Sequence, residues 1–149
     1  MKKEILDWLS FPTFNVFVTV SLKQAIENEY GGWSRLTPEQ VTRTAWLLRD
    51  RSTKALVGKK KKFPFLAFAE GDGFIKRKHL HFIVASPTEI SLMEFSDKLR
   101  FQALKLDWVY NEIDIRPIEA NEHRRVIAYS LKEGLSAFIP EASFVPHMN

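Results

Sequence analysis

Two apolar segments separated by a short glycine-containing stretch constrain the fold of this chain most. Residues 63–70 and 79–85 are rich in aromatic and β-branched side chains, which favour strands. Gly71-Asp72-Gly73 interrupts the pattern between them, so we expect an antiparallel hairpin with a long tip. Such pairing brings Glu70, at the end of the first segment, close to the two histidines that open the second.

The rest of the chain predicts strands and helices around this hairpin. Residues 15–21 have the composition of a buried strand, and residues 111–116 alternate as a half-exposed strand does. A loop is expected at residues 30–33. Three helices are expected: one from the N-cap Thr37, with a capping box to Gln40, to about Arg51; one from Ser86 to about Leu104; and one capped by Asn121. The order β-α-β-β-α-β-α favours an α+β fold with a largely antiparallel sheet.

Length and composition predict a single globular domain over residues 1–149, with a partly irregular tail at about residues 135–149. The absence of cysteine excludes disulfides and thiolate-zinc sites. No apolar run approaches the roughly 20 residues of a membrane span. Acidic residues among the first nine argue against a signal peptide. We therefore expect a soluble cytoplasmic protein with no membrane partner.

His79 and His81 are the first candidate site residues. Side chains alternate along a strand, so both imidazoles project from one face. With the Glu70 carboxylate they form a two-histidine, one-carboxylate set that suits Mn²⁺ or Mg²⁺ acting as a Lewis acid on a phosphate oxygen. Zn²⁺, Co²⁺ or Ni²⁺ would also bind such a set. Taken alone, a His-x-His pair is more often an ordinary pair of strand residues, and Glu70 an ordinary strand-end carboxylate.

Tyr129 and Lys132 are the second candidate pair. They stand at i and i+3 of the expected third helix and share one of its faces. A neutral phenol is a weak nucleophile, but a metal-bound phosphate is easier to attack, and Lys132 could stabilise the transition state or the phenolate. In isolation, a core-edge tyrosine and a solvated lysine would be the simpler interpretation. Tyr30 and Tyr110 lack a lysine one helical turn further on.

In combination and in order, three motifs resemble those of the HUH endonuclease family, in particular the rolling-circle replication initiators (Rep proteins) of plasmids, phages and single-stranded DNA viruses. Residues 17–22 resemble the first Rep motif, a strand containing Thr and Leu. His79-Leu80-His81-Phe82 resembles the second, and residues 129–134 resemble the Tyr-x-x-Lys helix of the third. Glu70 stands where many viral Reps place a third metal ligand. The resemblance spans about residues 16–134.

The resemblance implies a fold and a mechanism. The fold is a central antiparallel sheet of about five strands flanked by helices, a ferredoxin-like relative, with the two-histidine strand in the middle. A metal on His79, His81 and Glu70 would polarise the scissile phosphate. Tyr129 would attack it, forming a 5′-phosphotyrosine and releasing a 3′-hydroxyl that can prime replication, and reversal would join strands. One catalytic tyrosine places the chain with the single-tyrosine Reps.

The same resemblance implies partners. The substrate would be single-stranded DNA at a replication origin, in a prokaryotic cytoplasm or, for a viral protein, in the host cell. A homodimer is one way to supply the nucleophile for a second transfer. The chain contains no Gly-x-x-x-x-Gly-Lys-Ser/Thr segment, so it is either a small initiator that would use a host helicase or a nuclease domain of a longer protein. Two other functions stay open: a non-catalytic nucleic-acid-binding module, and a tyrosine transposase of the same superfamily.

Clustered cations are candidate DNA contacts on a chain of net charge +4. We expect several of them to converge around the metal, although any single lysine run is more often a solvated loop. Trp33, Phe74 and Trp108 are candidate base-stacking residues. The candidate phosphate contacts are Lys59, Lys60, Lys61, Lys62, Lys76, Arg77, Lys78, Arg124 and Arg125.

Overall fold

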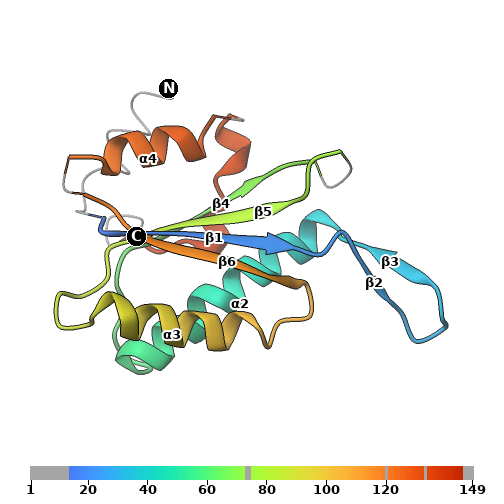
Figure 1. Ribbon diagram of the computed structural model, residues 1–149, viewed down its shortest axis with the longest axis horizontal. Helices are drawn as coiled ribbons and strands as arrows, with labels where there is room; N and C mark the ends of the chain where they lie inside the picture. The colour runs from blue at the N-terminus through green and yellow to red at the C-terminus, as the bar shows by residue number, and fades with distance from the viewer. Residues whose placement is uncertain (1–13, 73–74, 120, 133, 146–149) are drawn as a thin grey trace.

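A four-stranded antiparallel sheet forms the centre of the computed structural model, which describes residues 14–72, 75–119, 121–132 and 134–145. The strand order is β4-β5-β1-β6 (Figure 1). Its strands are β1 (Val16–Leu22), β4 (Phe65–Glu70), β5 (His79–Val84) and β6 (Val109–Pro117). The expected α+β class is confirmed, and the two-histidine strand β5 is internal, as expected. The sheet has four strands, however, where about five were expected.

A separate two-stranded hairpin, β2 (Ala25–Glu27) and β3 (Trp33–Arg35), extends beyond the end of β1 (Figure 1). The loop expected at residues 30–33 is therefore only the tip of this hairpin and the start of β3. Gly31, with φ of 80°, takes the left-handed conformation that the turn requires. A five-residue connection containing glycine is a hairpin signal, but three-residue strands are too short to show alternation.

Helices cover the two faces of the sheet. α2 (Pro38–Val57) and α3 (Leu92–Ala103) lie on one face, and α4 (His123–Ser130) lies on the other (Figure 1). Alternating strand residues divide the core accordingly. Val18, Val20, Leu80 and Phe82 pack with α2 and α3, while Leu66, Phe68 and Ile83 pack with Ile127 and Leu131 around α4; all of these side chains are buried.

One of the three expected helix starts is confirmed and two are wrong. The capping box of Thr37 and Gln40 is confirmed, although α2 runs on to Val57 rather than ending near Arg51. The start predicted at Ser86 is wrong, because α3 begins after Ser91, whose hydroxyl accepts a hydrogen bond from the Glu94 amide at 3.0 Å. The cap predicted at Asn121 is also wrong, since Glu122 is the N-cap of α4 and makes no side-chain capping bond.

The described part of the C-terminal tail is more regular than expected. It contains two short 3₁₀ helices, η1 (Leu135–Ala137) and η2 (Pro140–Ala142). Between and after them the chain bonds to β4, with isolated bridges at Phe65–Phe144 and Phe68–Phe138. The tail thus covers most of an edge strand whose peptide groups would otherwise be unpaired. The remainder of the expected tail, residues 146–149, lies outside the described residues.

None of the helices within the described ranges is long and apolar enough to cross a membrane.

Candidate functional site

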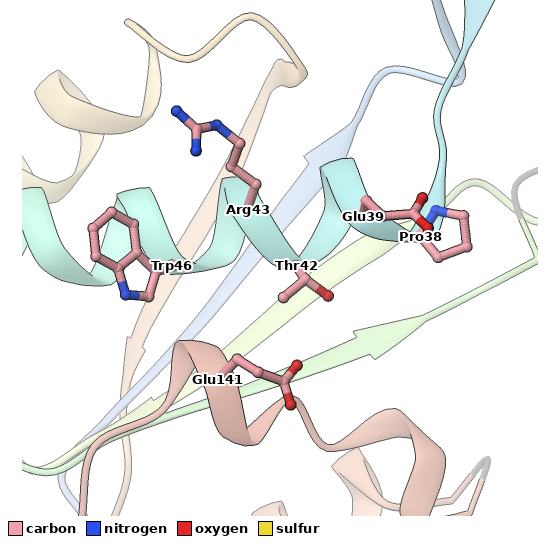
Figure 2. A pocket seen from close by; sticks show the side chains of 6 residues that line it. All are labelled: Pro38, Glu39, Thr42, Arg43, Trp46 and Glu141. Carbon is pink, nitrogen blue, oxygen red and sulfur yellow. The ribbon is translucent and has the colours of Figure 1, made fainter.

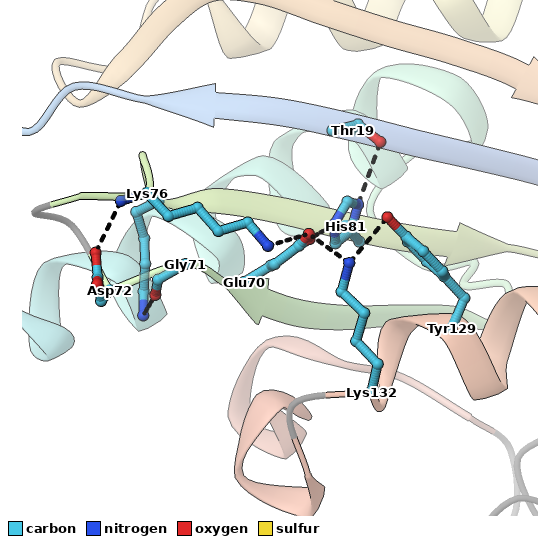
Figure 3. Close-up of polar contacts among 9 residues, drawn as sticks. Thr19, Glu70, Gly71, Asp72, Lys76, His81, Tyr129 and Lys132 are labelled. Carbon is cyan, nitrogen blue, oxygen red and sulfur yellow. Dashed lines mark hydrogen bonds and ion pairs between the residues drawn. The ribbon is translucent and has the colours of Figure 1, made fainter.

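The sheet register places the three predicted metal ligands on one face. Glu70 pairs directly with His79 across β4 and β5, and His81 lies two residues further along β5 on the same side. This is the face that α4 covers, and its buried contacts extend from Leu66 and Ile83 to Phe68, which pairs with His81. Tyr129, near the end of α4, and Lys132 reach over the histidine end (Figure 3). Lys132 was expected on this helix, but α4 ends at Ser130 and Lys132 lies in the turn that follows.

Glu70 is the centre of the polar network. Its side chain is buried, and one carboxylate oxygen, Oε2, lies 3.1 Å from Nε2 of His81. The other oxygen, Oε1, lies 3.2 Å from the ammonium nitrogen of Lys132 and 3.4 Å from that of Lys76 (Figure 3). Burial alone raises the pKa of Glu70, but hydrogen bonds from His81 and Lys132 outweigh it and lower this pKa to about 2. Glu70 is therefore an anion held by two cations and an imidazole.

His81 is buried and uses both ring nitrogens. Its Nδ1 lies 3.2 Å from the hydroxyl oxygen of Thr19, and its Nε2 faces Glu70. Burial lowers the pKa of His81, more than the contact with Glu70 raises it, so the ring is neutral at pH 7. Because the Glu70 carboxylate can only accept, Nε2 carries the proton and Nδ1 accepts from Thr19. The ring also stacks on Phe17, with centroids 5.4 Å apart.

Tyr129 presents its phenol at the border of this network. Its ring contacts His81 edge to face, with centroids 6.2 Å apart, and half of the residue (50%) is exposed. The ammonium of Lys132 donates to the phenol oxygen at 3.0 Å and lies 4.1 Å from the ring centroid. That hydrogen bond, together with Glu70, raises the pKa of Lys132, so this ammonium stays protonated. Tyr129 is thus accessible, next to a cation and on the histidine side of the sheet.

His79, His81 and Glu70 are residue types that bind divalent metals, and they lie on one face of the sheet. Their present side-chain arrangement, however, does not form a metal site. His79 and His81 are stacked, with centroids 6.4 Å apart, and the available Glu70 oxygens are engaged by His81 and two lysines. Across the described parts of the chain, no three His, Cys, Asp or Glu side chains form a group that could hold a metal ion. Binding a metal therefore requires the lysines to leave Glu70 and the His81 ring to exchange its tautomer.

The predicted cations do not all converge on this network. Lys76 does, through its contact with Glu70. Arg77 instead donates to the Leu22 carbonyl at 3.2 Å and lies over the Tyr110 ring, 4.7 Å from its centroid. Lys78 is locked onto the Gly71 carbonyl at 2.7 Å. Of these three cations, therefore, only Lys76 contacts the network around Glu70.

The other cations lie further away. Residues 59–62 precede β4 and stand at its Phe65 end, about 17 Å of strand from Glu70. This run does not lie beside the candidate metal ligands, because the run and Glu70 lie at opposite ends of one extended strand. Arg124 and Arg125 are exposed on α4, and Arg125, four residues before Tyr129, shares its helix face.

The candidate base-stacking residues differ in their exposure to solvent. Trp33 is 70% exposed, whereas Trp108 is 9% exposed and belongs to the core. Phe74 lies outside the described residues. Sequence reasoning did not anticipate the bond from Thr19 to His81 or the contact of Lys76 with Glu70. The first could be found from the register, since Thr19 pairs directly with His81; the second depends on the path of the hairpin tip and has no sequence signal.

Comparisons with protein-family models, with curated protein sequences and with solved structures found no match to this chain.

Proposed function

We propose that this chain nicks and joins single-stranded DNA through a covalent tyrosine intermediate, as a single-tyrosine replication initiator of the HUH type. The observation that carries the proposal is the continuous chain of contacts Tyr129–Lys132–Glu70–His81, which connects the half-exposed phenol to the buried carboxylate and imidazole. It combines an exposed nucleophile, a cation on the nucleophilic oxygen and an anionic, imidazole-paired centre. Its residues come from β4, β5, α4 and the turn that follows α4.

The proposed reaction is a transesterification at phosphorus. The phenol oxygen of Tyr129 attacks the scissile phosphate and loses its proton to solvent. A bond from this oxygen to phosphorus forms, the bond from phosphorus to the 3′ oxygen breaks, and the 3′ oxygen takes up a proton. The ammonium of Lys132 donates to the attacking oxygen and stabilises its developing negative charge. Attack of a 3′-hydroxyl on the phosphotyrosine reverses these steps and joins strands.

A divalent metal is part of the proposal. Mn²⁺ or Mg²⁺ would be held by His79, His81 and Glu70, and it would withdraw charge from the phosphate oxygens. The Thr19 hydroxyl would then accept from Nδ1 of His81, an outer contact that orients a metal-ligating imidazole. Origin DNA, a homodimer for the second transfer and a host helicase belong to the same proposal.

A non-catalytic nucleic-acid-binding module is the second candidate. One observation favours it: Glu70, His81, Lys132 and Thr19 satisfy one another's hydrogen bonds, as a purely structural network would. Such a module would bind DNA without a covalent adduct and without divalent metal. A transposase of the same superfamily would share the adduct, and would differ only in the DNA ends that it recognises.

The test is detection of a protein–DNA adduct. The protein is incubated with Mn²⁺ and a pool of single-stranded oligonucleotides, and products are separated under denaturing conditions. We expect an adduct with the native chain, none with Tyr129→Phe, and unchanged adduct with Tyr110→Phe, a matched control at another partly exposed tyrosine. DNA binding by Tyr129→Phe should stay near the native level. An adduct that survives Tyr129→Phe would refute the assignment of the nucleophile.

A further inference from the structure

A pocket of about 390 Å³ lies near the Glu70 end of β4, on the face of the sheet that α2 covers and opposite the candidate site. We call it the hairpin pocket. It lies where the base of the β2–β3 hairpin, the start of α2, the end of β4 and the β4–β5 tip meet. Its apolar walls include Leu36, Val41, Ala69 and Ile139. The walls also carry polar and charged side chains of both signs, from Gln24, Arg35, Thr37, Thr42, Asp72, Lys78 and Ser136.

This lining suits a nucleobase. Ligand pockets combine apolar walls with a few polar groups and usually enclose about 300–1,000 Å³, so the hairpin pocket has room for one base with its sugar. A base has two apolar faces and an edge of donors and acceptors. Carboxylate, amide, hydroxyl and cationic side chains lie in the walls, and those already bonded, such as Lys78 to the Gly71 carbonyl, would exchange that contact for the edge of the base.

Trp33 extends this surface outward along the hairpin. Trp33 and Arg35 are two residues apart on β3 and therefore project from the same face of the ribbon, about 7 Å apart. Arg35 lines the pocket, and the Trp33 ring is 70% exposed. The hairpin tip is fixed, because the Asn28 side-chain carbonyl accepts from the amides of Tyr30 and Gly32, both at 3.0 Å. An exposed indole on a fixed support is a stacking platform for a second base.

The pocket and the candidate site share one structural border. On β4, Ala69 faces the pocket and its neighbour Glu70 faces the site; at the tip, Lys78 lines the pocket and His79 faces the site. A flexible strand with one phosphate beside Tyr129 would therefore reach the pocket by passing the β4–β5 tip. This continuity favours a nucleic acid over a protein as the occupant.

We propose that the hairpin pocket and Trp33 bind bases of the single-stranded DNA next to the phosphate that Tyr129 attacks. The proposal rests on the proposed function, whose substrate it extends. Glu27, which pairs with Trp33, and the nearby Glu29 disfavour a phosphate at Trp33, so Trp33 would contact a base. Its contribution to affinity should therefore depend little on salt, unlike that of lysine–phosphate contacts.

The experiment measures binding of a fluorescently labelled mixed-sequence single-stranded oligonucleotide by anisotropy, at several salt concentrations, with the full chain. Trp33→Ala should weaken binding about 5- to 150-fold, the range for loss of one base–aromatic stack, without changing the salt slope. Ala69→Phe, which fills the pocket, should weaken it as well. Trp46→Ala is the matched control: Trp46 is also exposed, but it lines a different pocket, between α2 and η2 (Figure 2).

The outcomes separate this proposal from the proposed function. Native affinity in both Trp33→Ala and folded Ala69→Phe overturns it, even when Tyr129-dependent adduct forms. Weakened binding in a protein that forms no adduct supports the pocket and contradicts the nicking activity. Trp33 is exposed, so its replacement should leave the fold intact, as thermal unfolding would check. A Trp33→Ala variant that changes only self-association would assign the hairpin to a protein interface and overturn the proposal.

Discussion

The ammonium nitrogen of Lys132 lies 3.0 Å from the phenol oxygen of Tyr129 and 3.2 Å from a carboxylate oxygen of Glu70. Tyr129 is on α4, Lys132 is in the turn after that helix, and Glu70 ends the edge strand of the sheet. One cation thus connects the candidate nucleophile with the buried anion.

Replacing Lys132 should slow the reaction more than it weakens binding. Lys132→Ala removes the one donor that contacts the attacking oxygen, and loss of such a donor typically costs about 100- to 1,000-fold in rate. Single-turnover adduct formation at saturating DNA measures this rate. Lys132→Arg should recover part of it. Lys98→Ala is the control, because Lys98 is a similarly exposed lysine paired with Glu94 on the opposite side of the sheet. An equal loss in both variants would argue for a general charge effect.

Removing divalent metal should stop adduct formation, and Mn²⁺ should restore it. His79→Ala should raise the Mn²⁺ concentration needed, because it deletes one proposed ligand that is only partly buried. Calorimetric titration of Mn²⁺ into the DNA-free protein gives an independent readout. Thr19→Val should weaken metal binding about 10- to 100-fold through the orientation of His81. Adduct formation at full rate in a chelator would remove the metal from the proposal.

Glu70 should make the metal-free protein less stable in acid. Its pKa is about 2 in the folded chain against an ordinary value of 4.5, so between these values the unfolded chain binds more protons. Its stabilisation is complete above pH 4.5 and is lost as the pH falls toward 2. We expect about 1–2 kcal/mol, because the lysine partners are partly exposed and screened. Urea unfolding of the native chain and of Glu70→Gln, in chelator, should give free energies that converge as the pH falls; parallel curves would contradict this.

The lysines at residues 59–62 should matter only for longer DNA. They stand at the far end of β4, so a short oligonucleotide at Tyr129 does not reach them. Replacing all four with alanine should leave adduct formation with a substrate of about three nucleotides unchanged and should reduce the salt slope for longer strands. Lys76→Ala, next to Glu70, should affect both substrates. Equal losses with short and long DNA in the fourfold variant would mean that the run contacts the site.

Much of the sheet could be predicted because its signals are local. Glycines between two apolar segments predict a hairpin, and residue alternation then puts Glu70, His79 and His81 on one face without further information. The capping box at Thr37 is also a local device. The start of α3 was misplaced because Ser86, Thr88 and Ser91 all precede it and tertiary packing selects among them. The start of α4 was misplaced by one residue because its N-cap, Glu122, makes no side-chain capping bond.

The sequence by itself determined which residues share a strand face, because a period of two allows no other arrangement, and it placed Tyr129 and Lys132 three residues apart near the end of a helix. Only the tertiary structure decided that α4 packs on the histidine face. That choice depends on the long-range burial of Ile127 and Leu131 against Leu66 and Ile83. The same packing turned Lys132 toward Glu70 and left residues 59–62 at the far end of the strand, because contacts between distant segments have no periodic signal in the chain.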